Sequence, residues 1–272
     1  MSTPAALIMG GSSGIGEATA RVFVKARGAV VITGRNQDRL RSAVERLRDA
    51  HAHADVQGHS VDAREHAQLQ RLFERLGEIN HLVLALSGAA GAGPIHELDL
   101  AELRAGFDGK TLPYIACVQA ALPKMSSNGS ITMVTAGSAQ SALPGTAGLA
   151  AVNGALEATI RPLALELAPI RINAVSPGVI DTPWWEATAV DRRAAIHSSA
   201  ANASAVGRVG KPEEVAHLIH ALATNDFVTG VTVPCDGGLR LTAGRAREVT
   251  PRTTDQQSNP EGLIIASLPR CH

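Results

Sequence analysis

Short apolar runs alternate with helical patterns over most of the chain. The apolar runs that have the length of buried strands cover residues 5–9, 29–34, 54–61, 81–86, 130–135 and 171–175. Because most of these runs are apolar throughout, they are typical of parallel strands that are covered on both faces. The pattern predicts one α/β domain, a doubly wound parallel sheet of about seven strands with helices on both faces.

Three long helical patterns are predicted over residues 37–51, 100–125 and 146–167. Pro113 and Pro162 lie inside the last two, and proline lacks the N–H that a helix interior needs. We therefore expect a kink or break at each proline.

The composition changes after residue 241, where arginine, proline and glutamine become frequent. This change predicts a domain over residues 1–241, followed by a flexible extension over 242–272.

The balance of charges excludes several classes of partner. Lys plus Arg and Asp plus Glu number 25 each, which gives no electrostatic case for binding nucleic acid or an acidic membrane.

The three cysteines are far apart, so neither a disulfide framework nor a metal site is indicated. The first apolar run is too short to cross a bilayer and has no basic lead-in. We expect a soluble cytoplasmic protein.

A glycine- and serine-rich turn joins the first apolar run to a helical pattern. Its residues are Gly10, Ser12, Ser13, Gly14, Ile15 and Gly16. Glycine permits positive φ and close approach of a ligand, and the N-terminus of the following helix suits a pyrophosphate. The spacing departs from G-x-G-x-x-G, so the turn alone leaves a nucleotide site and an ordinary structural turn both open.

Two polar positions follow the next two predicted strands. Arg35 stands where NAD-binding folds usually place an acid for the ribose 2′-hydroxyl. A guanidinium there can pair with a 2′-phosphate, which predicts NADP(H) as the cofactor, although a solvent-facing arginine is the alternative. Asp62 is expected to accept a hydrogen bond from the adenine amino group, to cap the helix that starts near Arg64, or to do both.

Later motifs complete a specific resemblance. With the turn glycines and Asp62, the segments Asn173–Pro183, Gly207–Glu214, Thr229–Gly230 and Cys235–Gly238 resemble the short-chain dehydrogenase/reductase family. The resemblance covers residues 4–241 and implies a Rossmann-type fold that pairs subunits as a homodimer or homotetramer.

The resemblance also implies cofactor contacts near the ends of the later strands. In relatives the segment matching Pro177, Gly178, Ile180 and Thr182 brackets the nicotinamide. The backbone at Ile180 would meet the carboxamide, and the Thr182 hydroxyl would meet the pyrophosphate. Ser87 and Gly88 are further candidates, although relatives read Asn-Asn-Ala-Gly where this chain has Ala85–Gly88.

The residues that usually carry this family's chemistry are all changed. Leu149 stands at the place of the proton-donating tyrosine and Asn153 at that of the lysine. Ala136 replaces the serine, with Ser138 two residues on, and Lys110 stands where the asparagine belongs. Because Tyr114 is the only tyrosine of the chain, the usual tyrosine mechanism is excluded.

Three functions remain open. In the first, the protein is an NADP(H) oxidoreductase for an apolar carbonyl or imine, with Lys110 as a substituted proton donor. Tyr114, one helical turn on, could assist it, and Asn153 could still hydrogen-bond the ribose. The alternatives are an ion pair for Lys110 and core packing for Tyr114. In the second function the cofactor is held without hydride transfer, and in the third the pocket performs non-redox chemistry such as a cyclisation.

Two adjacent indoles, Trp184 and Trp185, follow the nicotinamide segment. They predict an apolar lid over the substrate, with plain packing of at least one of them as the alternative.

Overall fold

The protein is described here by a computed structural model that covers residues 6–51, 54–88 and 90–242. Its sheet is parallel throughout, with the strand order β3-β2-β1-β4-β5-β6-β7. The strands are β1 Ala6–Met9, β2 Val30–Gly34, β3 Val56–Ser60, β4 Ile79–Leu84, β5 Met125–Val134, β6 Arg171–Pro177 and β7 Thr232–Cys235. The doubly wound parallel sheet is confirmed. The extension predicted over 242–272 lies, beyond its first residue, outside the described residues.

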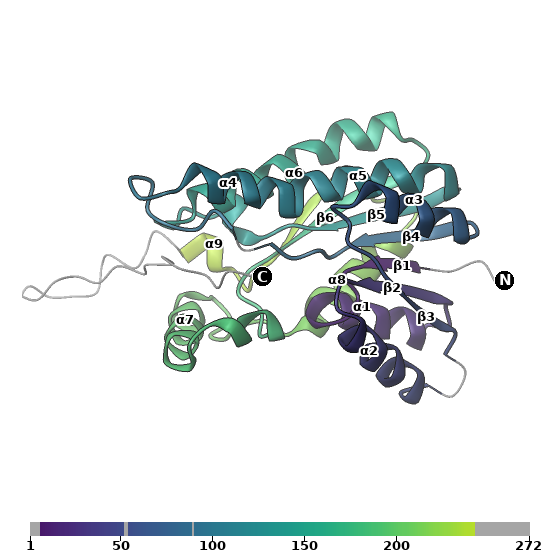
Figure 1. Cartoon of the computed structure of the whole chain (residues 1–272). Coiled ribbons are helices and arrows are strands. Elements are labelled where there is room, and N and C mark those ends of the chain that lie inside the picture. Colours follow the sequence, from purple (N-terminus) through teal and green to yellow (C-terminus); the bar gives the residue numbers. More distant parts are fainter. Residues whose placement is uncertain (1–5, 52–53, 89, 243–272) are drawn as a thin grey trace, which may run out of the picture.

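Helices cover both faces of this sheet (Figure 1). The α-helices of the described residues are α1 Gly14–Lys25, α2 Gln37–Asp49, α3 His66–Arg75, α4 Leu100–Gly106, α5 Leu112–Ala121, α6 Ala147–Glu166, α7 Val190–Ala203, α8 Pro212–Thr224 and α9 Leu239–Thr242. Of these, α7 and α9 lie away from the faces of the sheet (Figure 1). Side chains of α1, α2 and α8 form one apolar core with Ile8, and those of α3, α5 and α6 form another with Leu7. Successive residues of a strand point to opposite faces, so β1 contributes to both cores.

The connections reverse direction beside β1. The chain passes from β1 outward to β3 and then returns to place β4 on the other side of β1. In open parallel sheets the crevice at the carboxyl ends of the strands beside such a reversal is the usual ligand site. The glycine turn after β1 lies at this point.

The helix expected over residues 100–125 is divided. A π-helical turn, Phe107–Thr111, separates α4 from α5, and Pro113 is the second residue of α5. The helical hydrogen-bond pattern thus changes just before the proline, as its missing N–H leads us to expect. The helix ends earlier than expected because Leu122–Lys124 forms a 3₁₀ turn, and β5 already begins at Met125, which pairs with Ile79.

The helix expected over residues 146–167 is not interrupted at the proline where the sequence predicts a kink or break. α6 continues through Pro162 without a break. Ile160 and Ala164, on either side of the proline, are buried in the core. Packing of these side chains against the sheet keeps the helix continuous where local propensity favours an interruption.

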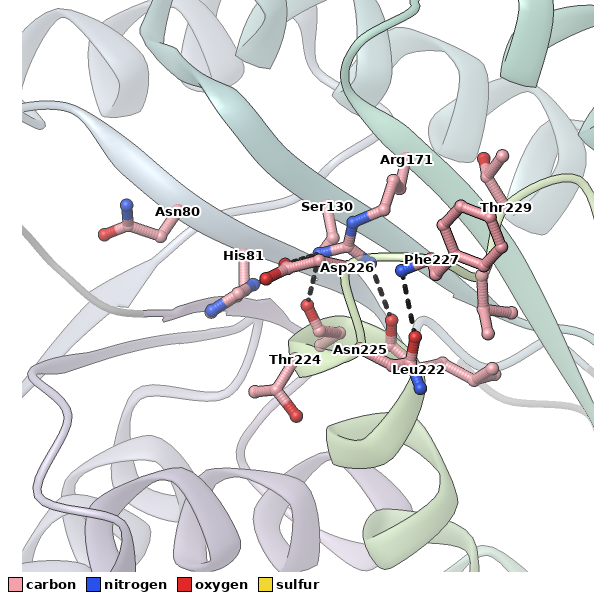
Figure 2. A network of polar contacts seen from close by, with 12 residues as sticks. Asn80, His81, Ser130, Arg171, Leu222, Thr224, Asn225, Asp226, Phe227 and Thr229 are labelled. Carbon is pink, nitrogen blue, oxygen red and sulfur yellow. Dashed lines mark hydrogen bonds and ion pairs between the residues drawn. The ribbon is translucent and has the colours of Figure 1, made fainter.

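A buried arginine joins the start of β6 to the last turn of α8, at the amino end of the sheet (Figure 2). Arg171, the first residue of β6, donates to the carbonyl oxygens of Leu222 at 2.9 Å and Ala223 at 2.7 Å. These carbonyls belong to the last turn of α8, where a cation also interacts favourably with the helix dipole. Asp226 is 3.6 Å away, and His81 pairs with Ser130 beside it at 2.8 Å.

We expect Arg171→Met to lower the free energy of unfolding by about 2–4 kcal/mol, because two buried carbonyls lose charge-assisted hydrogen bonds. Urea unfolding followed by circular dichroism measures this loss. Arg41→Met is the matched control, since Arg41 forms only an exposed ion pair with Asp38. An equal loss in both variants would contradict a specific role for Arg171.

Candidate functional site

The glycine turn adopts the left-handed conformation that glycine permits at two of its three predicted positions. Gly10 and Gly14 adopt φ values of 84° and 54°, in the left-handed region that favours glycine. Gly16 differs from the expectation because its φ is not positive; a Cβ there would lie 2.1 Å from the carbonyl oxygen of Gly10. Gly16 therefore lets α1 pack on the turn. The conformational freedom belongs to the other two glycines.

The remaining turn residues surround the N-terminus of α1. Ser13 is the N-cap residue, in an extended conformation, and its side chain makes no capping hydrogen bond. A Cβ at Gly34 would lie 2.7 Å from Ser12 Oγ, so Ser12 borders the end of β2. A Cβ at Gly14 would lie 3.4 Å from Thr182 Cβ, which brings the predicted pyrophosphate-binding threonine to the turn. Ile15 packs partly on the core below. The first-turn amides and Thr182 together suit an anion.

Two guanidinium groups flank Asp62 at the ends of β2 and β3. Arg35 is exposed directly after β2. Asp62 accepts hydrogen bonds from the backbone N–H and the Nε of Arg64, both at 3.0 Å. Arg64, with a smaller contribution from Arg35, lowers the pKa of Asp62. α3 begins at His66 with Glu65 as its N-cap, so Asp62 binds a turn and does not cap the helix. The role of Arg64 was missed from the sequence.

Lys110 is a buried cation at the carboxyl end of the sheet. Its side chain is 6% exposed, and Nζ donates to the carbonyl oxygen of Thr135, one residue past β5, at 3.1 Å. Burial lowers the pKa of Lys110 from 10.5 to about 8, and the charge of Glu157 partly opposes this shift. A Cβ at Gly88 would lie 3.3 Å from Lys110 Cβ, which places the segment after β4 against the lysine. Ser87 is exposed beside Gly88.

Tyr114 has the environment of a core residue. It is 0% exposed, and its hydroxyl lies 2.8 Å from the carbonyl oxygen of Val134 and 3.1 Å from that of Leu86. Burial raises the pKa of Tyr114 well above 10.0. The Lys110 Nζ is 5.7 Å from the centre of the ring. This geometry favours packing over the assisting role considered from the sequence.

α6 presents a polar side chain that is only half satisfied. Asn153 Nδ2 donates to the carbonyl oxygen of Leu149 at 2.9 Å, whereas the buried Oδ1 has no hydrogen-bond partner among the described residues. The Oγ of Ser138 is in the same situation. Such groups are costly to bury unless a ligand or water supplies the missing partner.

Hydrogen bonds fix the path of the segment Pro177–Thr182, which the resemblance predicts to lie beside the nicotinamide. Gly178 N–H donates to the carbonyl oxygen of Cys235 at 3.1 Å, and a Cβ at Gly137 would lie 3.0 Å from the carbonyl oxygen of Pro177. Trp185 Nε1 donates to the carbonyl oxygen of Ile180 at 2.8 Å. Trp185 is therefore buried against this segment. Trp184 contacts it edge-on, with ring centres 4.6 Å apart, and is only partly buried.

A largely apolar pocket of about 450 Å³ lies at the start of α6. It is lined by Pro94, Ile95, His96, Ser141, Ala142, Leu143, Pro144, Gly145, Thr146, Ala147 and Ala150. His96, the one titratable side chain in this lining, is exposed and pairs with Glu97 at 3.4 Å. The pocket adjoins Leu149 in sequence and suits an uncharged, apolar compound.

Two further findings concern the described residues only. No group of three or more His, Cys, Asp or Glu side chains there is arranged to hold a metal ion. None of the described helices combines the length and the hydropathy that crossing a membrane requires.

Comparisons with known proteins find similarity over most of the chain. The family model described as enoyl-(acyl carrier protein) reductase matches residues 10–240. Cis-4-hydroxycyclohexanecarboxylate dehydrogenase from Sinomonas cyclohexanicum is 33% identical over 241 residues, which covers 86% of this chain and 95% of that protein.

Two solved structures share the fold at similar identity. A small-chain dehydrogenase in complex with NADPH has a TM-score of 0.74 at 26% identity, covering 88% of this chain and 100% of that one. A short-chain oxidoreductase from Pseudomonas aeruginosa PAO1 that contains an atypical catalytic centre has a TM-score of 0.79 at 27% identity, covering 87% and 97%.

Proposed function

Because the chain belongs to the short-chain dehydrogenase/reductase family, we propose that it is an NADP(H)-dependent oxidoreductase acting on an apolar carbonyl or imine compound. The observation that carries the proposal is the buried Lys110 ammonium at the carboxyl end of the sheet. A general acid works best when its pKa lies near the operating pH, and burial moves the pKa of Lys110 to about 8.

The described residues fit a dinucleotide at three points. The left-handed Gly10 and Gly14 shape the turn beside the α1 N-terminus, where a pyrophosphate would bind. Arg35 would pair with a 2′-phosphate, and the unpartnered Asn153 Oδ1 would accept from a ribose hydroxyl. The small-chain dehydrogenase solved with NADPH supports the same cofactor. The bound cofactor would supply the hydride that the substrate carbon receives in the reduction.

The other cofactor contacts are proposed from the positions of their elements. The segment with Pro177, Gly178, Ile180 and Thr182 would hold the nicotinamide side, because backbone bonds and the Trp185 indole fix its path. Ser12, Ser13, Ile15 and Gly16 would support the pyrophosphate. Asp62 would border the adenine, and Ser87 with Gly88 would border the ribose.

In the proposed reduction, Lys110 carries the proton that the substrate oxygen or nitrogen receives. Its Nζ holds this proton at rest while donating to the Thr135 carbonyl oxygen. Leu149, at the place of the family's tyrosine, cannot transfer a proton. The Pseudomonas aeruginosa oxidoreductase is a relative whose catalytic centre is likewise atypical.

The lining of the pocket supports the substrate class. It offers mainly aliphatic and small side chains, together with the exposed His96. The Sinomonas relative, named for a cyclohexane derivative, supports a ring-containing substrate for this chain as well. A homodimer or homotetramer is also proposed; Leu112 on α5 and Leu165 on α6 are exposed apolar side chains on the helices that relatives pair.

A second function is favoured by the apolar Leu149 at the place of the family's acid. In this case NADP(H) is bound without hydride transfer, or the pocket performs non-redox chemistry such as cyclisation. The arrangement of the turn and of Arg35 would be the same, so cofactor binding alone does not separate the two functions.

The experiment combines binding with turnover. We expect calorimetric titration to show tighter binding of NADPH than of NADH, and absorbance of bound NADPH to fall with at least one cyclic ketone or imine from a panel. Size-exclusion chromatography with light scattering reports the oligomer. Equal affinity for both cofactors would contradict the NADP(H) assignment, whereas tight NADPH binding without oxidation across the panel would favour the second function.

A further inference from the structure

We propose that Glu157 is a positioning residue that holds the Lys110 ammonium in place through Thr135. This inference rests on the proposed function of Lys110 as proton donor. Glu157 lies on α6, Thr135 just after β5 and Lys110 in the π-helical turn, so three elements meet at one group of side chains.

Thr135 is the link because it binds both charged residues at once. Its carbonyl oxygen accepts from Lys110 Nζ at 3.1 Å, and its hydroxyl donates to Glu157 Oε1 at 2.7 Å. The second carboxylate oxygen of Glu157 accepts from Gln140 Nε2 at 2.8 Å. Both oxygens are thus engaged, which fixes the direction of the carboxylate.

Among the groups around Lys110, Glu157 stabilises the charged form of the lysine. From α6, Glu157 is the acid whose charge raises the pKa of Lys110 against the larger effect of burial. From α5, Tyr114 contributes a ring whose hydroxyl stays neutral because burial raises its pKa. β5 contributes the Thr135 oxygens. A carboxylate near a buried ammonium stabilises the charged form, and in this protein that form carries the proton.

The arrangement also differs from the one that the resemblance implies. The resemblance places a lysine at position 153, but this chain has Asn153 there and carries its lysine at position 110. Glu157 lies one turn after Asn153 on the same face of α6. Glu157 on α6 is therefore located where Thr135 can connect it with the Lys110 ammonium in the π-helical turn.

The test follows the Lys110 side chain directly. The chain has four lysines, all within the described residues, and only Lys110 is buried, so NMR of isotope-labelled lysine side chains resolves its titration. We expect Glu157→Gln to lower the midpoint of the Lys110 titration by about 0.5–1 pH unit, because the charge that favours the ammonium is removed. Glu166→Gln, an exposed change of the same kind on α6, is the matched control and should leave the midpoint unchanged.

Two further variants keep the test decisive. Glu157→Asp retains the negative charge, so the midpoint of the Lys110 titration should stay close to the native value. Thr135→Val removes the hydroxyl that binds Glu157 and should lower the midpoint. The high-pH limb of the activity profile should move in the same direction as the midpoint. An unchanged midpoint in folded Glu157→Gln would overturn the inference. A lowered midpoint in an enzyme whose turnover does not need Lys110 would instead overturn the proposed function.

Discussion

Replacing Lys110 with methionine is expected to lower kcat/KM for reduction by about 10²–10⁴-fold, the range that general acid catalysis usually contributes. Methionine has a similar length and is apolar, so it fills the buried site of Lys110 without offering a proton. NADPH affinity, measured by calorimetry, should change by less than about threefold, because Lys110 is assigned to the substrate and not to the phosphates.

Tyr114→Phe is the control for this result. The Tyr114 hydroxyl binds the carbonyl oxygens of Val134 and Leu86 inside the core, so its loss should reduce stability while kcat/KM changes by less than about threefold. If Tyr114→Phe abolished turnover and Lys110→Met did not, the assignment of the proton donor would be reversed.

Arg35→Ser is expected to weaken NADPH binding by about 10–100-fold, because it removes charge-assisted hydrogen bonds to the 2′-phosphate. NADH lacks that phosphate, so its affinity should stay nearly constant. Calorimetric titration of both cofactors measures the two changes in one variant.

The neighbouring Arg64 provides the control for Arg35. Its guanidinium is already paired with the Asp62 carboxylate, so Arg64→Ser should weaken NADPH binding by less than about threefold. Equal losses for NADPH and NADH in Arg35→Ser would show that Arg35 acts on the shared part of the dinucleotide or on the fold.

The sheet could be predicted because its signal is local. Apolar runs such as Ala6–Met9 and Val30–Gly34 become strands buried on both faces, and the intervening patterns become helices. The π-helical turn Phe107–Thr111 has no signal in the periodicity of the sequence; Gly106, directly before it, packs closely against Ala90 and against Val152 of α6. Pro162 shows the converse, because packing of α6 overrides a local signal.

The site was predictable to the extent that single positions define it. Gly10, Gly14 and Lys110 could be named from spacing and resemblance; the structure gives the two glycines left-handed φ and buries Lys110. The hydrogen bond between Thr135 and Glu157 could not be inferred from the sequence, because the two residues are 22 positions apart and meet only when β5 and α6 pack together. Of the two roles predicted for Asp62, adenine binding and helix capping, the second is wrong, because the helix begins later and the carboxylate binds Arg64.

The central claim is that the Lys110 ammonium supplies the proton for reduction. Its most direct test is the pH dependence of single-turnover NADPH oxidation by the native protein and by Lys110→Met, with the best compound of the panel. Because the pKa of Lys110 is lowered to about 8, the ammonium is present below that pH and is lost above it. We expect the native rate to fall as pH rises through about 8, and the variant rate to be low and independent of pH in this range. A variant that oxidises NADPH at the native rate with the native pH profile would contradict the claim.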